Sequence, residues 1–303
     1  MTTGSDVHWV LLGYGPLARR VLEVSLAEDW PPSAIVTHAE ASDLDTVSVT
    51  DVAKASSIEC ATTNPNEEGL SWLKALGPEA IFTVNYRRIL KPQVLDISRA
   101  DGFNVHGSLL PILRGRSPLT WSIILGHEQT GVTVHRLEAE VDTGDIVAQE
   151  SIPIGPQDTS LTIQQKMLEM YPVLVYRTLD GLARETLTYR PQVGQATYGE
   201  RRTPDDGEID WTWSASRIYD WVRALTDPYP GAFTTLGGDR LYIWQVSVVE
   251  SCQSEARPGS VIGRYRSLSV GDSWGVACGD GLVCIEATDP PVSELRQGVI
   301  LGD

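Results

Sequence analysis

Val7-His-Trp-Val-Leu-Leu-Gly-Tyr-Gly-Pro-Leu-Ala18 is the stretch that decides the fold class of this chain. An apolar run of strand length leads into a glycine-rich turn, and a helical pattern follows from Leu17 to Leu26. The next apolar run, Ala34 to Thr37, has the features of a second strand. This order of strand, helix and strand predicts a βαβ unit, the building block of a parallel sheet.

The same alternation continues to about residue 185. Further strands are expected at Ala80 to Val84, Gly102 to His106, Gly131 to Leu137 and Ile146 to Ile152. Helices are expected at Leu70 to Leu76, Pro92 to Ile97 and Leu161 to Leu182. Residues 1–190 are therefore predicted to form one α/β domain on a mostly parallel sheet, with His106 at the carboxyl end of a strand, where ligands bind in such sheets.

The pattern changes after this domain. An amphipathic helix is expected at Ala215 to Leu225, and short alternating strands follow it. Gly279-Asp280-Gly281 separates the apolar runs Trp274 to Cys278 and Leu282 to Ile285, which indicates a β-hairpin. We expect residues 200–303 to form a small β-barrel of the OB type.

Composition and charge exclude several classes of protein. Of 303 residues, 42% are hydrophobic and 21% charged, as in ordinary globular proteins. The net charge of -16 argues against non-specific binding to nucleic acid or anionic membranes. Four cysteines are too few for a disulfide scaffold, which fits a reducing cytoplasm. The apolar run Val7 to Gly15 is too short to span a membrane, so a cytoplasmic protein is expected.

Gly13-Tyr-Gly-Pro-Leu-Ala18 also fits the G-x-G-x-x-A pattern of dinucleotide-binding proteins. Such proteins place a ribose-binding acid at the tip of the next strand. Here Thr37 and His38 stand at that tip, and Glu40 is the nearest carboxylate. A nicotinamide-dependent oxidoreductase therefore stays an alternative, and so does a purely structural role for the glycines.

Asn104, His106 and Asp142 are the candidates for chemistry. Asn104 and His106 are two apart on a strand, so their side chains share a face, and they supply an amide donor and a base that titrates near neutrality. Asp142-Thr-Gly resembles the aspartic protease triplet, but only one copy is present, and that mechanism needs two aspartates. The histidines show no metal-binding spacing, so no catalytic metal is expected.

Three stretches in order resemble the folate-dependent formyltransferases: Asn104-Val-His-Gly-Ser-Leu-Leu-Pro111, Gly131-Val-Thr-Val-His135 and Val141-Asp-Thr-Gly-Asp-Ile146. The resemblance implies a Rossmann-like catalytic domain that uses N10-formyltetrahydrofolate. It assigns catalysis to Asn104, His106 and Asp142, which stabilise an oxyanion and move a proton. It also places the folate against Arg88-Ile89-Leu90 and Ala139-Glu140-Val141, mostly through backbone groups.

The resemblance continues through Tyr198-Gly-Glu-Arg-Arg-Thr-Pro-Asp-Asp-Gly207 and Val222 to Phe233, and thus covers nearly the whole chain. A tRNA-modifying member should carry basic surface. Residues 201–303 instead hold nine Arg, no Lys and fifteen Asp and Glu. The segment His106-Gly-Ser-Leu-Leu-Pro111 is most similar to the domain that formylates UDP-4-amino-4-deoxyarabinose.

We therefore expect a nucleotide-linked amino sugar as the small-molecule amine substrate. Its diphosphate would be bound by a few local cationic and polar groups, for which the candidates are Ser108, Arg114, Arg116, Arg201 and Arg202. An amine intermediate of natural-product biosynthesis, methionyl-tRNA, and a non-catalytic binding module stay as alternatives. The sequence leaves a homodimer open.

Overall fold

The computed structural model describes residues 7–38, 48–249, 254–267, 271–291 and 295–302. The chain divides into two compact units. The first unit consists of residues 1–118, 129–153 and 164–199. The second consists of residues 119–128, 154–163 and 200–303. Glu40, the nearest carboxylate to the second strand tip, lies outside the described residues.

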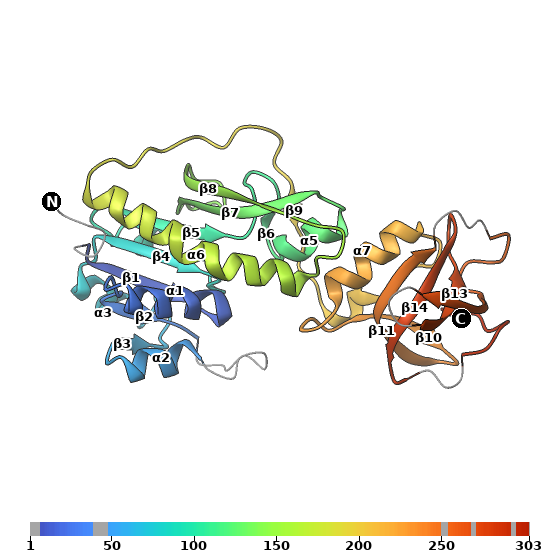
Figure 1. The fold of residues 1–303 in the computed structure, drawn as a ribbon. Coiled ribbons are helices and arrows are strands. Elements are labelled where there is room, and N and C mark those ends of the chain that lie inside the picture. Colours follow the sequence, from blue (N-terminus) through green and yellow to red (C-terminus); the bar gives the residue numbers. More distant parts are fainter. Residues whose placement is uncertain (1–6, 39–47, 250–253, 268–270, 292–294, 303) are drawn as a thin grey trace. The chain divides into compact units, whose positions relative to one another are not determined.

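A mostly parallel sheet forms the centre of the first unit. Its strands are β1 (Trp9–Gly13), β2 (Ala34–Val36), β3 (Glu59–Ala61), β4 (Ala80–Val84), β5 (Asp101–His106), β7 (Gln129–Arg136) and β8 (Ile146–Pro153). They lie in the order β3-β2-β1-β4-β5-β7-β8, and the first five are parallel to their neighbours, whereas β7 and β8 add antiparallel pairs (Figure 1). The predicted α/β class with a mostly parallel sheet is therefore confirmed.

Four helices connect the parallel strands: α1 (Gly15–Ala27), α2 (Val49–Ala55), α3 (Leu70–Leu76) and α4 (Pro92–Leu95). The long helix α6 (Ser160–Ala183) follows β8. A guanidinium nitrogen of Arg20 on α1 lies 3.0 and 3.1 Å from the two carboxylate oxygens of Glu169 on α6. This contact joins two helices that are far apart in the sequence.

The two glycines of the first turn have structural roles. A Cβ on Gly13 would lie 2.6 Å from the Cβ of Ala18, so only glycine lets α1 approach β1 this closely. Gly15 has a φ of 73°, a left-handed conformation that glycine adopts without strain. Helix packing and turn geometry thus account for the G-x-G-x-x-A pattern.

Aromatic and branched side chains fill the core of this unit. Trp9, Phe82 and Phe103, on β1, β4 and β5, are almost fully buried. The rings of Trp9 and Phe82 meet edge to face with centroids 5.6 Å apart, and those of Phe82 and Phe103 are 5.0 Å apart. Each such burial stabilises the fold by about 1.5–3 kcal/mol, which fixes the strands that carry the candidate site.

A small antiparallel sheet and one helix form the main part of the second unit. The strands are β10 (Ala232–Leu236), β11 (Asp239–Val249), β12 (Val261–Ser267), β13 (Gly271–Ala277) and β14 (Leu282–Asp289), in the order β10-β11-β14-β13-β12. β13 and β14 pair in antiparallel fashion with Ala277 opposite Leu282, which confirms the predicted hairpin. The OB-type barrel stays a prediction.

Helix α7 (Ala215–Leu225), in the second unit, has the bounds that the sequence predicted. Its buried face includes Ile218, Trp221 and Val222 and packs in the core of this unit. The carboxylate of Asp280, in the hairpin turn, accepts a hydrogen bond of 2.7 Å from the backbone N–H of Ala215. A carboxylate at a helix N-terminus is stabilising, so the hairpin turn caps the helix. Within the described residues, no helix combines the length and hydropathy that a membrane span requires.

Candidate active site

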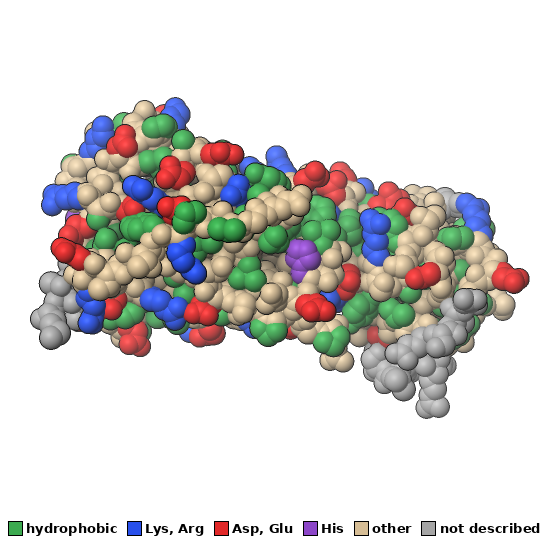
Figure 2. Space-filling view, turned by 90° about the horizontal axis from the view of Figure 1, so that it is seen from above, with side chains coloured by type: hydrophobic (Ala, Val, Ile, Leu, Met, Phe, Trp, Pro, Cys, Tyr) green, Lys and Arg blue, Asp and Glu red, His purple; other side chains and the backbone are tan. Residues whose placement is uncertain are grey.

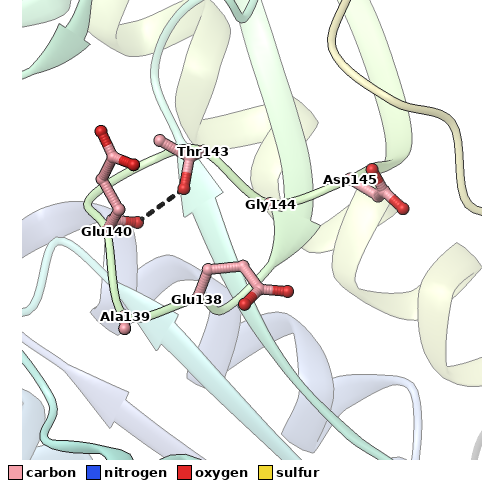
Figure 3. Close-up of a pocket in the computed structure, with 6 residues that line it drawn as sticks. All are labelled: Glu138, Ala139, Glu140, Thr143, Gly144 and Asp145. Atoms are coloured by element: carbon pink, nitrogen blue, oxygen red, sulfur yellow. Dashed lines mark hydrogen bonds between the residues drawn. The ribbon is translucent and has the colours of Figure 1, made fainter.

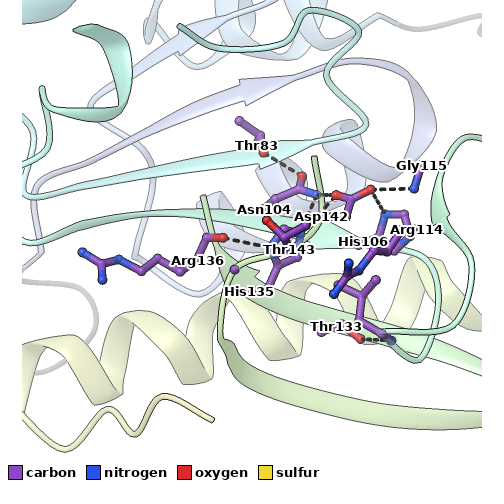
Figure 4. Close-up of polar contacts among 12 residues, drawn as sticks. Thr83, Asn104, His106, Arg114, Gly115, Thr133, His135, Arg136, Asp142 and Thr143 are labelled. Atoms are coloured by element: carbon purple, nitrogen blue, oxygen red, sulfur yellow. Dashed lines mark hydrogen bonds and ion pairs between the residues drawn. The ribbon is translucent and has the colours of Figure 1, made fainter. Parts of the chain in front are cut away.

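Three polar side chains stand in one row across the sheet of the first unit. Thr83 of β4 is opposite Asn104 of β5, and Asn104 is opposite His135 of β7. Successive strand residues point to opposite faces, so residues paired in register project from the same face. The sheet therefore places these three side chains side by side, next to His106 and Asp142 (Figure 4).

Asn104 is held by hydrogen bonds on both ends of its amide. The Thr83 hydroxyl donates to Asn104 Oδ1 over 2.7 Å, which fixes the orientation of the amide. Asn104 Nδ2 lies 3.1 Å from Asp142 Oδ1 and 3.1 Å from His135 Nε2. Because the backbone carbonyl of Arg136 can only accept, His135 Nδ1 carries a proton and donates to it over 2.9 Å. In the neutral ring, His135 Nε2 is therefore free to accept from Asn104.

His106 is buried, and both of its ring nitrogens face a partner. Nε2 donates to the backbone carbonyl of Leu113 over 2.8 Å, since that carbonyl can only accept. Nδ1 lies 3.5 Å from Asp142 Oδ2. Burial lowers the pKa of His106 below its usual value, although the charge of Asp142 opposes this effect. Nδ1 of the neutral ring is thus a proton acceptor directed at a carboxylate.

Asp142 lies in a tight turn between β7 and β8. It has a φ of 56°, which is uncommon for a residue with a side chain, and it is 8% exposed. A Cβ on Gly144 would collide with the carbonyl oxygen of Arg136, so this turn requires glycine two residues later. The backbone N–H of Gly115 donates to Asp142 Oδ2 over 2.8 Å. These contacts hold the carboxylate in one orientation.

The environment of Asp142 keeps it ionised. Burial acts to raise its pKa, but a hydrogen bond from the protonated His135 ring, the positive charges of the protonated His106 and His135 rings, and the Gly115 amide outweigh burial and lower the pKa to about 2. Its Oδ1 lies 3.2 Å from His135 Nε2. The candidate site therefore combines the fixed carboxylate of Asp142, the buried imidazole of His106 and the oriented amide of Asn104. These are the parts needed to move a proton and to stabilise an oxyanion.

The structure brings the three predicted catalytic residues together. Asp142 Oδ1 lies 3.1 Å from Asn104 Nδ2, and Asp142 Oδ2 lies 3.5 Å from His106 Nδ1, at the carboxyl end of β5. The catalytic role of these residues stays a prediction. The sequence analysis assigned no role to four further groups of this site: Thr83, the Gly115 amide, His135 and Gln192. The position of His135 could have been predicted, because antiparallel pairing of β5 with β7 places it opposite Asn104.

The predicted folate contacts lie in two places. Ala139 and Glu140 line a pocket of about 430 Å³ together with Glu138, Thr143, Gly144 and Asp145 (Figure 3). In the other segment, Leu90 is buried in an apolar cluster against which Leu137 packs, whereas Ile89 is 68% exposed. Val141 and Arg88 are exposed as well. Folate binding by these segments stays a prediction.

The predicted substrate-binding residues have diverse surroundings. The Ser108 hydroxyl is buried and donates to the carbonyl of Ile112 over 2.6 Å. Arg114 donates from Nε and from a terminal nitrogen to Gln192, over 3.1 and 2.8 Å. Arg116 is exposed. Their role in substrate binding stays a prediction.

The remaining two arginines belong to the second unit. Arg201 is exposed. The guanidinium of Arg202 lies 4.4 Å from the ring centroid of Trp221 and 5.2 Å from that of Trp121. It also donates to the carbonyl of Asp206 over 2.6 Å. Arg202 thus already has cation–π and hydrogen-bond partners, whereas Arg201 is open to solvent.

Solved structures share this fold. HypX from Aquifex aeolicus, in complex with tetrahydrofolic acid, aligns over 93% of this chain with 18% identity and a TM-score of 0.64. This chain spans 44% of the length of HypX. An N-formyltransferase from Helicobacter canadensis, in complex with folinic acid and dTDP-3-aminofucose, aligns over 92% of this chain and 99% of its own, with 18% identity and a TM-score of 0.70.

A methionyl-tRNA formyltransferase from Clostridium thermocellum aligns over 81% of this chain and 95% of its own, with 20% identity and a TM-score of 0.57. At sequence identities of 18–20%, the likeness to these three structures shows a shared fold and nothing more. The sequence itself matches two family descriptions: residues 35–179 match "Formyl transferase", and residues 201–294 match "Formyl transferase, C-terminal domain". The chain therefore belongs to the formyl transferase family, whose enzymes take the formyl group from N10-formyltetrahydrofolate.

Proposed function

We propose that this chain transfers the formyl group of N10-formyltetrahydrofolate to the primary amine of a nucleotide-linked amino sugar. The observation that supports formyl transfer most directly is the ionised Asp142 carboxylate between Asn104 and His106. The first matched family segment, residues 35–179, includes all three residues and supports the same reaction. The choice of acceptor rests on charge and on one structural relative.

The reaction is an acyl transfer. The unprotonated amine attacks the formyl carbon, a new C–N bond forms, and the bond from that carbon to N10 of the folate breaks. The attacking nitrogen loses one proton and N10 gains one, so the products are the N-formyl compound and tetrahydrofolate. Asp142 and His106 take up the first proton and return it to N10, a contribution of about 10² to 10⁴-fold for general acid–base catalysis.

The intermediate of this transfer carries an oxyanion. Asn104 Nδ2 and His106 Nε2 are N–H donors whose present acceptors are His135, Asp142 and the Leu113 carbonyl. In our proposal, the formyl oxygen replaces a neutral acceptor as it gains charge. Hydrogen bonds to an anion are stronger than those to neutral groups, so this exchange favours the transition state over the ground state.

The charge of the chain favours a small-molecule amine over a nucleic acid as the acceptor of the formyl group. The chain carries a net charge of -16, and residues 201–303 contain no lysine. On the face shown in Figure 2, basic and acidic side chains are interspersed and the basic ones form no continuous area. A nucleoside diphosphate needs only one or two guanidinium groups, and Arg116 and Arg201 are exposed. The complex of the Helicobacter canadensis enzyme with dTDP-3-aminofucose adds an example of such a ligand on this fold.

A panel assay tests the proposal. The purified chain is incubated with N10-formyltetrahydrofolate and, separately, with dTDP- and UDP-linked amino sugars, small natural-product amines, and methionyl-tRNA. Mass spectrometry then detects the added formyl group. We expect formylation of at least one amino-sugar nucleotide.

Two results would overturn the choice of acceptor: formylation of methionyl-tRNA only, or formylation only of amines that carry no nucleotide. An increase in melting temperature with NADH or NADPH, and no formyl transfer to any acceptor, would overturn formyl transfer itself.

A further inference from the structure

The segment that follows α6 returns to the candidate site of the first unit. Residues 198–199 form the short strand β9 (Tyr198–Gly199), which pairs in parallel with β6 (Arg114–Gly115). A few residues before β9, the amide of Gln192 makes four hydrogen bonds. Its Nε2 donates to the backbone carbonyls of Asp142 and Gly144, over 2.9 and 2.8 Å. Its Oε1 accepts from Nε and a terminal nitrogen of Arg114.

These four hydrogen bonds connect the two backbone segments that orient the Asp142 carboxylate. One segment is the turn of Asp142 itself, where φ is 56° and the conformation needs support. The other is β6, where Gly115, next to Arg114, donates its backbone N–H to Asp142 Oδ2. Gln192 thus fixes the distance between the carboxylate and the amide that binds it.

We propose that Gln192 is a positioning residue for Asp142, which holds the Asp142 turn and the β6 segment in register so that the carboxylate stays aligned with His106. This inference rests on the proposed function, in which Asp142 moves the proton. It does not require Gln192 to touch either substrate. Errors of about 1 Å in such an alignment can lower turnover by roughly 10²-fold.

The segment has other attachments, so a change at Gln192 leaves it in place. The backbone N–H of Leu113 donates to the Thr197 hydroxyl over 2.8 Å, and the N–H of Thr197 donates to the carbonyl of Pro111 over 3.2 Å. The N–H of Arg114 donates to the carbonyl of Thr197 over 2.9 Å. Substitution of Gln192 therefore acts on the alignment of Asp142 rather than on the path of the chain.

The kinetic test compares three variants. Gln192→Met keeps the size of the side chain but removes all four hydrogen bonds. Gln192→Glu keeps an acceptor for Arg114 but turns an oxygen toward the carbonyls of Asp142 and Gly144. Gln195→Met is the matched control, because Gln195 is exposed in the same segment. We expect a loss of about 10-fold or more in kcat for both Gln192 variants, with KM for the folate donor unchanged within about 2-fold, and wild-type kinetics for the control.

A double-mutant comparison separates positioning of Asp142 from other roles. If Gln192 acts through Asp142, Gln192→Met should lower kcat by less than about 2-fold in a chain that already carries Asp142→Asn. An equal loss in both backgrounds would overturn the proposal. Wild-type activity of Gln192→Glu would overturn it as well, because the contact with Arg114 would then be sufficient.

A second measurement needs no substrate, so it distinguishes failure of this inference from failure of the proposed function. NMR titration of the histidine ring protons follows the protonation of His106. Since the Asp142 charge favours the protonated ring, a misaligned carboxylate should shift the His106 midpoint to lower pH in Gln192→Met. An unchanged midpoint would show that Gln192 does not hold Asp142 in place, whatever the acceptor of the reaction.

Discussion

The Asn104 amide lies 3.1 Å from Nε2 of His135, directly opposite it across the antiparallel pair of β5 and β7. The same amide nitrogen lies 3.1 Å from Asp142 Oδ1, so it can give one hydrogen to each group. A buried histidine that accepts from Asn104 thereby fixes where the other hydrogen points. The orientation of Asn104 depends on β7 as much as on its own strand.

His135→Leu should lower kcat by about 10-fold, because Asn104 then loses one of the two acceptors that hold its amide. His135→Gln retains a side-chain oxygen that can accept from Asn104, so it should recover part of the loss. Steady-state kinetics with saturating folate donor measure both effects. If the glutamine variant were no better than the leucine variant, with both folded by circular dichroism, His135 would act by some means other than acceptance from Asn104.

His106→Ala and Asp142→Asn should each lower turnover by roughly 10²-fold or more, the scale of lost general acid–base catalysis, while binding of the folate persists. Single-turnover rates and a separate equilibrium titration with tetrahydrofolate check the two parts. His127→Ala is a matched control on a histidine of the second unit and should leave turnover unchanged. Near wild-type turnover of either site variant would require a different assignment of the proton carrier.

The sequence predicts the first unit well because its long elements carry clear periodicity. β1, β4 and β5 are apolar runs in a buried sheet, and the predicted Ala80 to Val84 has the bounds of β4. Short elements were missed: β3 (Glu59–Ala61) has only partly buried or exposed residues, so it lacks an apolar signal. α2 (Val49–Ala55) buries only Val49 and Ala53, and its start depends on a local capping box at Ser48 and Asp51.

The candidate site was predictable where chemistry follows from residue type and strand position. Asn104 and His106 share a face by the two-residue period of a strand, and Asp142 follows a predicted strand in a glycine-containing turn. The Gly115 amide and Gln192 were not predictable in this way. The contact of Gly115 depends on the path of the segment after β5, and that of Gln192 on the path of the segment after α6; no local pattern encodes either path.

Stability should fall on acidification in two steps. Burial lowers the pKa of His106 in the folded state below its ordinary value of 6.5, so the unfolded chain binds the proton more readily and stability is lost as pH falls below 6.5. Asp142, with a folded pKa of about 2 against 3.8, contributes stability that is complete above 3.8 and is lost as pH falls toward 2. Thermal unfolding at closely spaced pH values measures the slope.

The contribution of His106 to this slope is isolated by a variant. His106→Asn cannot titrate, so the difference in melting temperature between wild type and variant should change with pH below 6.5 and be constant above it. A difference that did not change between pH 5 and 7 would show that His106 titrates alike in the folded and unfolded chains.

Arg116→Ala should raise KM for the amino-sugar nucleotide by about 10-fold or more and leave KM for the folate donor within about 2-fold, because a guanidinium group binds a diphosphate through strong charge-assisted hydrogen bonds. Arg116 is exposed and follows the β6 segment that supplies the Gly115 amide to Asp142, so it lies close to the reacting groups.

Arg184→Ala is the matched control, since Arg184 pairs with Asp180 on α6 and its loss should affect neither KM value. Arg116→Lys keeps the charge but loses the bidentate geometry, and should recover only part of the affinity. Equal effects of Arg116→Ala on both KM values would contradict a diphosphate contact at this position.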